Sequence, residues 1–351
     1  MDLSIFAILA QDGITSGSIY ALLALALVLV FSITRVIFIP LGEFVAFGAL
    51  SLAAIQAGKF PASATLLLVL GIGAFLQEAV TTLHTPAGQT DRMRAISIAG
   101  AKFLVLPVSI FGCARWVDGA SLPMLVQILL TLAIVAPMGP MIYRLAFQPL
   151  AEATVLVLLV VAVGVHFAML GTGLVMFGAE GSRTTPFSSA VIEVGSLMIS
   201  GQSLVIIATA ILLIAVLYLY FGRTLSGKAL RATAVNRLGA RLVGIGTTQA
   251  GRLAFTLASA IGALCGILIA PLTTVYYDSG FLMSLKGFVG AIMGGLGSYP
   301  AAAAGALLVG LLEAYSSFWA SAFKEVIVFT LIIPVLFWRS IMHPHVDEGD
   351  E

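Results

Sequence analysis

A few ionisable side chains stand inside long apolar segments, and they are the residues of this chain that could carry chemistry. Glu43 begins one apolar run, and His166 and Glu313 lie within two others. An ionisable group in a membrane segment is costly in lipid, so it is expected to face a cavity, a pathway or a partner side chain. The three residues therefore predict either contacts along a solute pathway or a relay for a proton or another cation.

Glu43 and His166 each have a plainer interpretation. Glu43 follows a Pro-containing interval, residues 37–43 (IFIPLGE), which resembles the break in a discontinuous transporter helix. A carboxylate is, however, also stabilised at a helix N-terminus at the membrane interface. His166 could make an ordinary hydrogen bond between helices. Arg35 could pair with Glu43, although a long cation near a helix end usually extends to the membrane surface.

Other chemistries find no support in the sequence. The phosphate-binding pattern G-x-x-x-x-G-K-[ST] does not occur, so we expect the chain itself to bind no ATP. No H-E-x-x-H sequence or Cys/His cluster indicates a metal site, and no nucleophile–base constellation indicates an intramembrane enzyme. We therefore expect no catalytic residue, no metal and no cofactor in this chain.

The chain that must position these residues is mostly apolar. Of its 351 residues 60% are hydrophobic and 9% are charged, and the mean hydropathy is +1.11. Recurring apolar runs predict an all-α, polytopic helical membrane protein with about ten membrane segments in one transmembrane domain, residues 1–351. The expected segments are 14–31, 43–58, 62–82, 96–114, 122–143, 154–177, 203–220, 253–271, 282–296, 301–318 and 326–338. An acidic tail, 341–351, follows them.

The longest polar interval, residues 221–252, contains no Asp or Glu. Its basic residues are Arg223, Lys228, Arg231, Arg237, Arg241 and Arg252. A basic loop between apolar spans normally lies on the cytoplasmic side. With this loop inside, alternation of the spans places the amino terminus outside and the carboxy terminus inside, and most other basic residues also reach the inner face.

The middle of this interval has the pattern of a short amphipathic helix. The repeated apolar residues are Leu230, Ala234, Leu238 and Leu242, and the polar residues around them are Lys228, Arg231, Asn236, Arg237 and Arg241. Gly239, Gly244 and Gly246 are expected to shorten or end the helix, because glycine disfavours helix interiors. Such a helix could rest on lipid headgroups, or it could insert its apolar stripe into a groove on a partner protein.

Several stretches resemble the high-affinity branched-chain amino-acid permeases, which are membrane subunits of ABC importers. Residues 227–245 (GKALRATAVNRLGARLVGI) are similar to the family's cytoplasmic coupling loop. Further stretches that resemble the family, in the same order, are 13–22 (GITSGSIYAL), 180–183 (EGSR), 290–305 (GAIMGGLGSYPAAAAG) and 311–315 (LLEAY). The resemblance covers residues 13–50 and 141–340.

The resemblance implies a multi-pass subunit of the bacterial inner membrane that imports a small polar solute, a branched-chain or other hydrophobic amino acid, by alternating access. A second, homologous permease subunit would complete the pore, and a periplasmic or extracellular binding protein would deliver the solute. Cytoplasmic ATPase subunits would hold ATP and Mg²⁺; no nucleic acid is expected. The coupling contacts would come from Lys228, Leu230, Arg231, Ala234, Asn236, Arg237, Leu238, Gly239, Arg241, Leu242 and Gly244.

Two regions depart from the family pattern. Residues 37–43 keep Gly42 and Glu43 but lack the Asn and His that usually precede them, which bears on substrate identity. Residues 60–120 do not match and suggest an extra helical pair.

Five glycines in the matched regions are candidates for the solute pathway or its gate: Gly42, Gly290, Gly294, Gly295 and Gly297. The last four have a spacing that lets helices pack closely, and they could also form a deformable gate along the pathway of Glu43 and His166.

An ion-driven secondary transporter, with Glu43, His166 and Glu313 as its relay, is the competing hypothesis. It predicts transport by the isolated protein that collapses with an uncoupler and ignores ATP. An importer subunit predicts instead that an ATPase subunit co-purifies with the chain.

Overall fold

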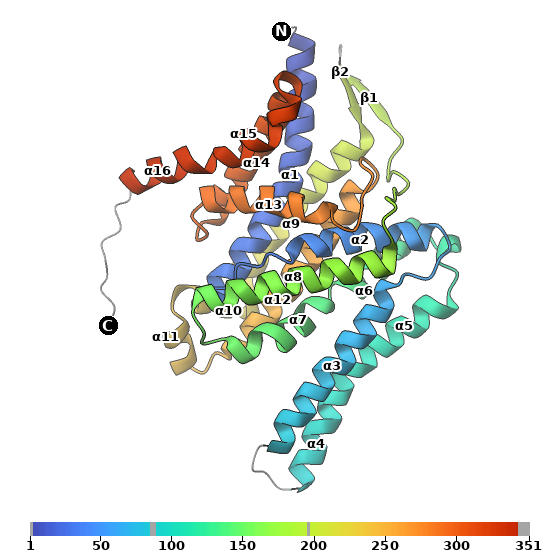
Figure 1. Cartoon of the computed structure of the whole chain (residues 1–351), viewed down its shortest axis with the longest axis vertical. Helices are drawn as coiled ribbons and strands as arrows, with labels where there is room; N and C mark the ends of the chain where they lie inside the picture. Colours follow the sequence, from blue (N-terminus) through green and yellow to red (C-terminus); the bar gives the residue numbers. More distant parts are fainter. Residues whose placement is uncertain (1–2, 85–88, 195–196, 343–351) are drawn as a thin grey trace.

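The computed structural model describes residues 3–84, 89–194 and 197–342, and helices account for most of them (Figure 1). Within these described residues, nine helical stretches are long and apolar enough to cross a membrane, and two shorter apolar helices, Leu41–Gln56 and Ser279–Met293, accompany them. The predicted helical membrane architecture is therefore confirmed. Most of the acidic tail lies outside the described residues.

The elements follow one another along the chain as α1 (Leu3–Thr34), α2 (Leu41–Gln56), α3 (Ser63–His84), α4 (Gln89–Gly100), α5 (Leu106–Trp116), α6 (Met124–Val135), α7 (Met138–Ile142), α8 (Val155–Phe177), β1 (Val191–Val194), β2 (Leu197–Ser200), α9 (Gly201–Arg223), α10 (Leu225–Val235), α11 (Arg237–Leu242), α12 (Thr247–Ile269), α13 (Ser279–Met293), α14 (Tyr299–Trp319), α15 (Lys324–Thr330) and α16 (Ile332–Met342). Single π-helical turns continue α4 into α5, over Ala101–Val105, and extend α7, over Tyr143–Phe147.

Helix α1 forms the centre of the bundle. It is apolar around most of its circumference, so most of its faces must be covered, and α9, α12, α13 and α14 pack around it (Figure 1). A Cβ atom on Gly13 would lie 2.8 Å from the Cα of Leu311, and one on Gly17 would lie 3.0 Å from the Cα of Leu307. The two glycines thus let the backbones of α1 and α14 approach closely.

The bundle has two distinct ends. The coupling end carries α10 and α11, and the hairpin end carries β1 and β2, which pair in antiparallel register within the expected polar connection 178–201 (Figure 1). The all-α prediction did not include this hairpin. Arg183 donates hydrogen bonds of 3.0 and 2.6 Å to the carbonyl oxygens of Pro271 and Leu272, so the connection is fixed to the segment after α12.

Helix α2 begins inside the bundle rather than at its surface. Its 16 residues extend about 24 Å at 1.5 Å per residue, less than the hydrocarbon thickness of about 30 Å. In the preceding break, the ring centroids of Phe38 and Phe255 are 4.6 Å apart, which places the break in the core. A Cβ atom on Gly42 would lie 2.6 Å from the carbonyl oxygen of Gly280, so the first turns of α2 and α13 touch.

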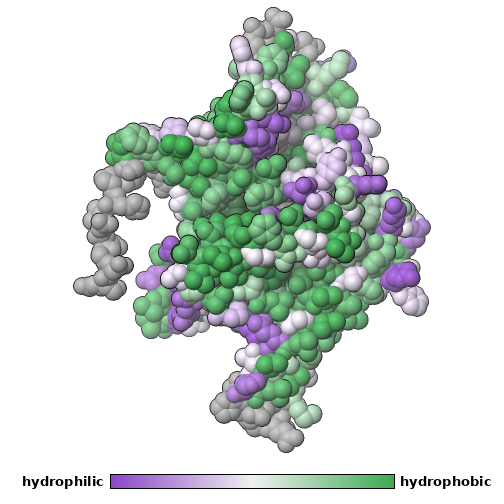
Figure 2. Space-filling view, in the orientation of Figure 1, coloured by the Kyte–Doolittle hydropathy of each residue, from purple (hydrophilic) through white to green (hydrophobic). Residues whose placement is uncertain are grey.

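Helix α3 and the continuous stretch from α4 to α5 form a helical pair that projects from the bundle at the coupling end (Figure 1). We call α3, α4 and α5 the helical arm. A Cβ atom on Gly71 would lie 2.6 Å from the carbonyl oxygen of Phe103, so its two halves pack backbone to backbone. In Figure 2 a broad apolar surface covers α8 and continues down the arm, as expected where helices face lipid or another membrane subunit.

Candidate functional site

Glu43 and His166 are brought together deep inside the bundle. Glu43 lies in the first turn of α2, next to the break, and His166 lies near the middle of α8. His166 Nδ1 lies 2.7 Å from Glu43 Oε1, and the two side chains are only 8% and 1% exposed. Each ionisable group therefore has the other as its polar partner, which is how such groups persist in a membrane interior.

The His166 ring contacts Phe281 of α13 and the exposed ring of Phe167, and the pair leaves one oxygen free. The ring centroids of Phe281 and Phe167 lie 4.7 and 5.1 Å from that of His166. Glu43 Oε2 is buried and has no hydrogen-bond partner among the described residues. Because an unpaired buried oxygen is costly, the pair presents an acceptor for a proton or a solute donor. The alternative pairing of Arg35 with Glu43 is wrong, since Arg35 is exposed and Glu43 is not.

Glu313 belongs to a different buried group. Its carboxylate accepts a hydrogen bond of 2.6 Å from Lys286 Nζ on α13 and another of 2.6 Å from the hydroxyl of Tyr20 on α1. Lys286 also lies 3.2 Å from Glu325. The three residues of the expected relay therefore do not form one contiguous group. Sequence reasoning assigned no role to Lys286, although a lone lysine in one apolar run and a glutamate in the next were a signal for this ion pair.

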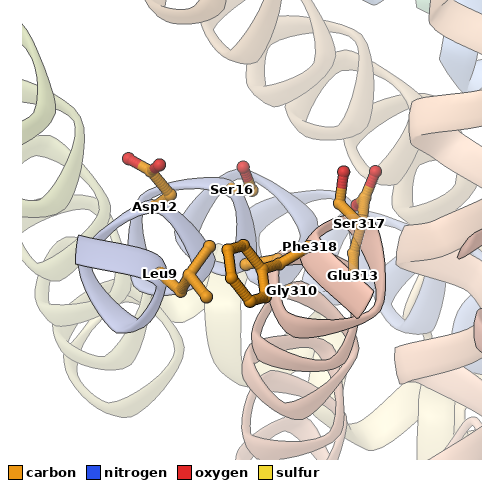
Figure 3. A pocket seen from close by; sticks show the side chains of 8 residues that line it. Leu9, Asp12, Ser16, Gly310, Glu313, Ser317 and Phe318 are labelled. Atoms are coloured by element: carbon orange, nitrogen blue, oxygen red, sulfur yellow. The ribbon is translucent and has the colours of Figure 1, made fainter. Parts of the chain in front are cut away.

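An open hollow of about 320 Å³ lies between α1 and α14 beside this buried group (Figure 3). In Figure 3 the oxygen atoms of Asp12, Ser16, Ser317 and Glu313 point to the same side of the two helices. Both oxygens of Glu313 are already engaged by Lys286 and Tyr20. The hollow is thus a polar surface feature of the half of the bundle nearer the hairpin end, distinct from the enclosed pair on α2 and α8.

The predicted gate glycines have three different surroundings. A Cβ atom on Gly290 would lie 2.6 Å from the Cα of Ala306, and one on Gly294 would lie 2.7 Å from the Cα of Ala302, so both face α14. Gly295 has a φ of +70° in the turn that ends α13, a conformation that favours glycine. Beside Gly297 the space is open, apart from Gly295 itself.

The coupling loop contains two short helices instead of one amphipathic helix. Asn236 is extended, with φ −147° and ψ 102°, and its side-chain oxygen accepts a 2.8 Å hydrogen bond from the Gly239 N–H. Asparagine is among the strongest N-cap residues, so it ends α10 and begins α11. The prediction of a continuous apolar stripe is therefore wrong. Gly244, with a φ of +85°, lies just after α11 and permits the turn there.

The four residues of the expected stripe divide into two pairs. Leu230 is 1% exposed and packs with Ala234 against α1 and α12. Leu238 and Leu242, on α11, are 68% and 80% exposed. Other large apolar side chains lie beside them on the surface. The exposed set, which we call the docking surface, is Val235, Leu238, Leu242 and Val243.

Polar residues of the loop fix α11 to the segment that precedes α8. Arg237 donates a 3.0 Å hydrogen bond to the carbonyl oxygen of Ala151, and Arg241 lies 2.9 Å from a carboxylate oxygen of Glu152. Lys228 and Arg231 are exposed on α10. A hollow of about 320 Å³ between α10 and the start of α12 completes this end of the molecule. It is lined mainly by Leu225, Ser226, Ala229, Ile245, Gln249 and Leu253.

Comparison with known proteins agrees with these features. The chain is 28% identical over 230 residues to the high-affinity branched-chain amino acid transport system permease protein BraD of Pseudomonas aeruginosa, covering 63% of this chain and 75% of BraD. It is 30% identical over 215 residues to the corresponding permease protein LivH of Escherichia coli K12, covering 58% and 69%. A probable branched-chain amino acid transport permease of Methanocaldococcus jannaschii is 25% identical over 265 residues, covering 74% and 79%.

No solved structure matches the chain. A family model described as branched-chain amino acid transport system / permease component matches residues 9–336. This match includes the Glu43–His166 pair, the Lys286 group and the whole coupling loop. Because it extends over nearly all of the described residues, the chain belongs to the branched-chain amino acid transport system permease family.

Proposed function

We propose that this chain is the transmembrane subunit of an ATP-driven importer for a small polar solute, a branched-chain or other hydrophobic amino acid. The observation that carries the proposal is the docking surface. Its four large apolar side chains are exposed on a basic loop, where the bundle does not cover them. An exposed apolar patch with a polar rim marks a protein contact, and the basic loop belongs on the cytoplasmic side. The partner is therefore a cytoplasmic ATPase subunit.

The other partners follow from the two remaining surfaces. A second, homologous permease subunit covers part of the apolar band in Figure 2 and completes the pore. A periplasmic or extracellular binding protein approaches the hairpin end, where Ser182 pairs with Val275 and Arg183 is hydrogen-bonded to the segment after α12. ATP and Mg²⁺ are held by the ATPase subunits, which close on ATP and move α11. In this proposal the amino terminus lies outside and the carboxy terminus inside the bacterial inner membrane, because the basic loop is taken as cytoplasmic.

The Glu43–His166 pair lies on the proposed solute pathway. Its depth in the bundle is that of the substrate sites of many transporters, which lie near the membrane midplane at broken helices. A hydrophobic amino acid carries an ammonium group and an apolar side chain. Glu43 Oε2 offers the acceptor for the first, and the ring of Phe281 offers apolar surface for the second.

The competing ion-driven mechanism has less support. Its relay needs Glu313 to exchange protons with Glu43 and His166, whereas Glu313 is held by Lys286 and Tyr20. An acceptor whose oxygens both receive strong hydrogen bonds from fixed donors is a poor proton carrier.

Co-purification tests the proposal. The tagged chain, extracted from its host membrane in mild detergent, should retain an ATPase subunit. Leu238→Asp combined with Leu242→Asp should abolish that retention, because two carboxylates cannot enter an apolar groove without a large desolvation cost. The matched control is Ile192→Asp on β1, another exposed apolar position, 47% exposed, which should retain the ATPase.

Two outcomes contradict the proposal. One is an ATPase that stays bound to the Leu238→Asp/Leu242→Asp variant as tightly as to the parent chain. The other is uptake by the chain alone in proteoliposomes that ignores ATP and collapses with an uncoupler. Arg237 is unsuitable for this test, because its hydrogen bond to Ala151 holds the loop together.

A further inference from the structure

Three basic side chains and one carboxylate meet where the helical arm joins the bundle. Arg144, in the turn after α7, lies 2.7 Å from Glu78 of α3. Lys102 Nζ and Arg252 Cζ lie 5.5 and 5.9 Å from the centroid of the Phe103 ring, so both cations contact the same aromatic side chain. We call Lys102, Arg144 and Arg252 the basic triad. Its members come from three separate parts of the chain, which only the fold brings together.

The basic triad carries more positive charge than its surroundings balance. Glu78 interacts electrostatically with the triad, and no second acidic side chain does so in the part of the chain that the structure describes. Three positive charges against one negative charge leave a local excess of +2. The Arg144 side chain is 10% exposed, yet its Nε has no hydrogen-bond partner among the described residues. Excess positive charge of this kind in a membrane protein is stabilised by a bound anion.

The three basic residues lie in the halves of their membrane spans that are nearer the coupling loop. Arg252 is in the second turn of α12, directly after the coupling loop, and Arg144 shortly precedes the segment that holds α11. Lys102 is exposed on the helical arm. The neighbouring side chains Ile98 and Val105 are 59% and 62% exposed and apolar. The triad therefore borders an apolar surface on the helical arm.

We propose that the basic triad binds the phosphate group of an anionic phospholipid, whose acyl chains lie along the helical arm. A guanidinium donates paired hydrogen bonds to phosphate oxygens, and an ammonium adds a point charge. Basic pockets between membrane helices on the cytoplasmic side suit such headgroups. The bound lipid bridges α4–α5 of the arm to α12, beside the loop that the ATPase is proposed to grip. This inference does not depend on the transported solute.

The test uses the full-length chain with the subunits that accompany it, delipidated in a neutral detergent. Phosphatidylglycerol, phosphatidylcholine and inorganic phosphate are the three probes, and binding is measured by native mass spectrometry and by the melting temperature. We expect phosphatidylglycerol to bind and to raise the melting temperature, whereas phosphatidylcholine and inorganic phosphate do not. Lys102→Gln and Arg252→Gln should each weaken phosphatidylglycerol binding about 5-fold, the equivalent of about 1 kcal/mol per basic residue.

A control variant separates this site from general surface charge. Arg115→Gln removes a basic residue at the other end of the arm and should leave binding unchanged. Without lipid, Lys102→Gln should be at least as stable as the parent, because it relieves repulsion within the triad. Unchanged phosphatidylglycerol affinity in the variant that combines Lys102→Gln with Arg252→Gln, or an equal loss with Arg115→Gln, would overturn the proposal. Inorganic phosphate binding as tightly as the lipid would assign the site to a soluble anion and overturn it as well.

Discussion

A carboxylate buried as deeply as Glu43 needs a partner that can adapt to its charge, and imidazole is suited to this because it donates, accepts or carries a proton near neutral pH. The 2.7 Å contact between His166 and Glu43 joins α8 to α2. The pair therefore has a structural role, which its hydrogen bond fulfils, and leaves Oε2 available for a second role. The position of Glu43 inside the bundle does not fit a carboxylate at the membrane interface, whereas His166 does make the expected hydrogen bond between helices.

Replacing Glu43 separates these roles. Glu43→Gln keeps an acceptor for His166 but removes the charge, so we expect uptake to fall while the ATPase still co-purifies. Uptake kinetics in proteoliposomes measure this. The control is Ser51→Ala, farther along α2, which removes a buried 2.6 Å hydrogen bond to Ser63 and should cost about 1 kcal/mol of stability without changing transport. Normal uptake by Glu43→Gln would remove Glu43 from the pathway.

Lys286 should be needed for folding. Lys286→Met leaves Glu313 and Glu325 without their cation, and breaking a buried ion pair on one side costs about 3 kcal/mol or more. We expect a lower melting temperature in detergent. Adding Glu313→Gln should recover part of the loss, because the amide needs no counter-charge. A double variant less stable than Lys286→Met alone would contradict this account.

At the level of helices, the coupling loop shows how far the spacing of apolar residues can predict helices and their buried faces. The pattern from Leu230 to Leu242 fits one helix, yet Asn236 caps a second helix and changes its direction. The apolar content of the loop was predictable. The division into buried and exposed pairs was not, because it depends on contacts between α10 and α1 that the local sequence does not contain.

Glycine positions give a second test at this scale. A Cβ atom on Gly266 of α12 would overlap the carbonyl oxygen of Val45 on α2, so Gly266→Ala should separate the two helices and lower the melting temperature markedly. Gly164→Ala on α8 is the matched control, since nothing lies within 4 Å of its added methyl group. That change should leave stability equal or raise it by up to about 1 kcal/mol, as alanine favours helices. Equal melting temperatures for the two variants would contradict the close packing of α2 and α12.

For the whole molecule, hydropathy was enough to predict a membrane bundle, because long apolar runs have few other folds available. It could not predict which helices are neighbours. The position of α1 at the centre, and the contact between His166 and Glu43 across 123 residues of sequence, arise from tertiary packing. The β1–β2 hairpin escaped prediction for the opposite reason: two strands of four residues carry too short a pattern.

The hydrogen bond from Arg237 to Ala151 gives the molecule a mechanical continuity. Ala151 lies a few residues before Thr154, which caps α8, and α8 is a single rod that carries His166 near its middle. A displacement of α11 must therefore either break its contacts with residues 151–152 or move the N-terminal end of α8 with it. In the second case the His166 end of the pair moves while the Glu43 end stays with α2. A displacement of α11 at the surface would thereby change the distance between His166 and Glu43 in the interior.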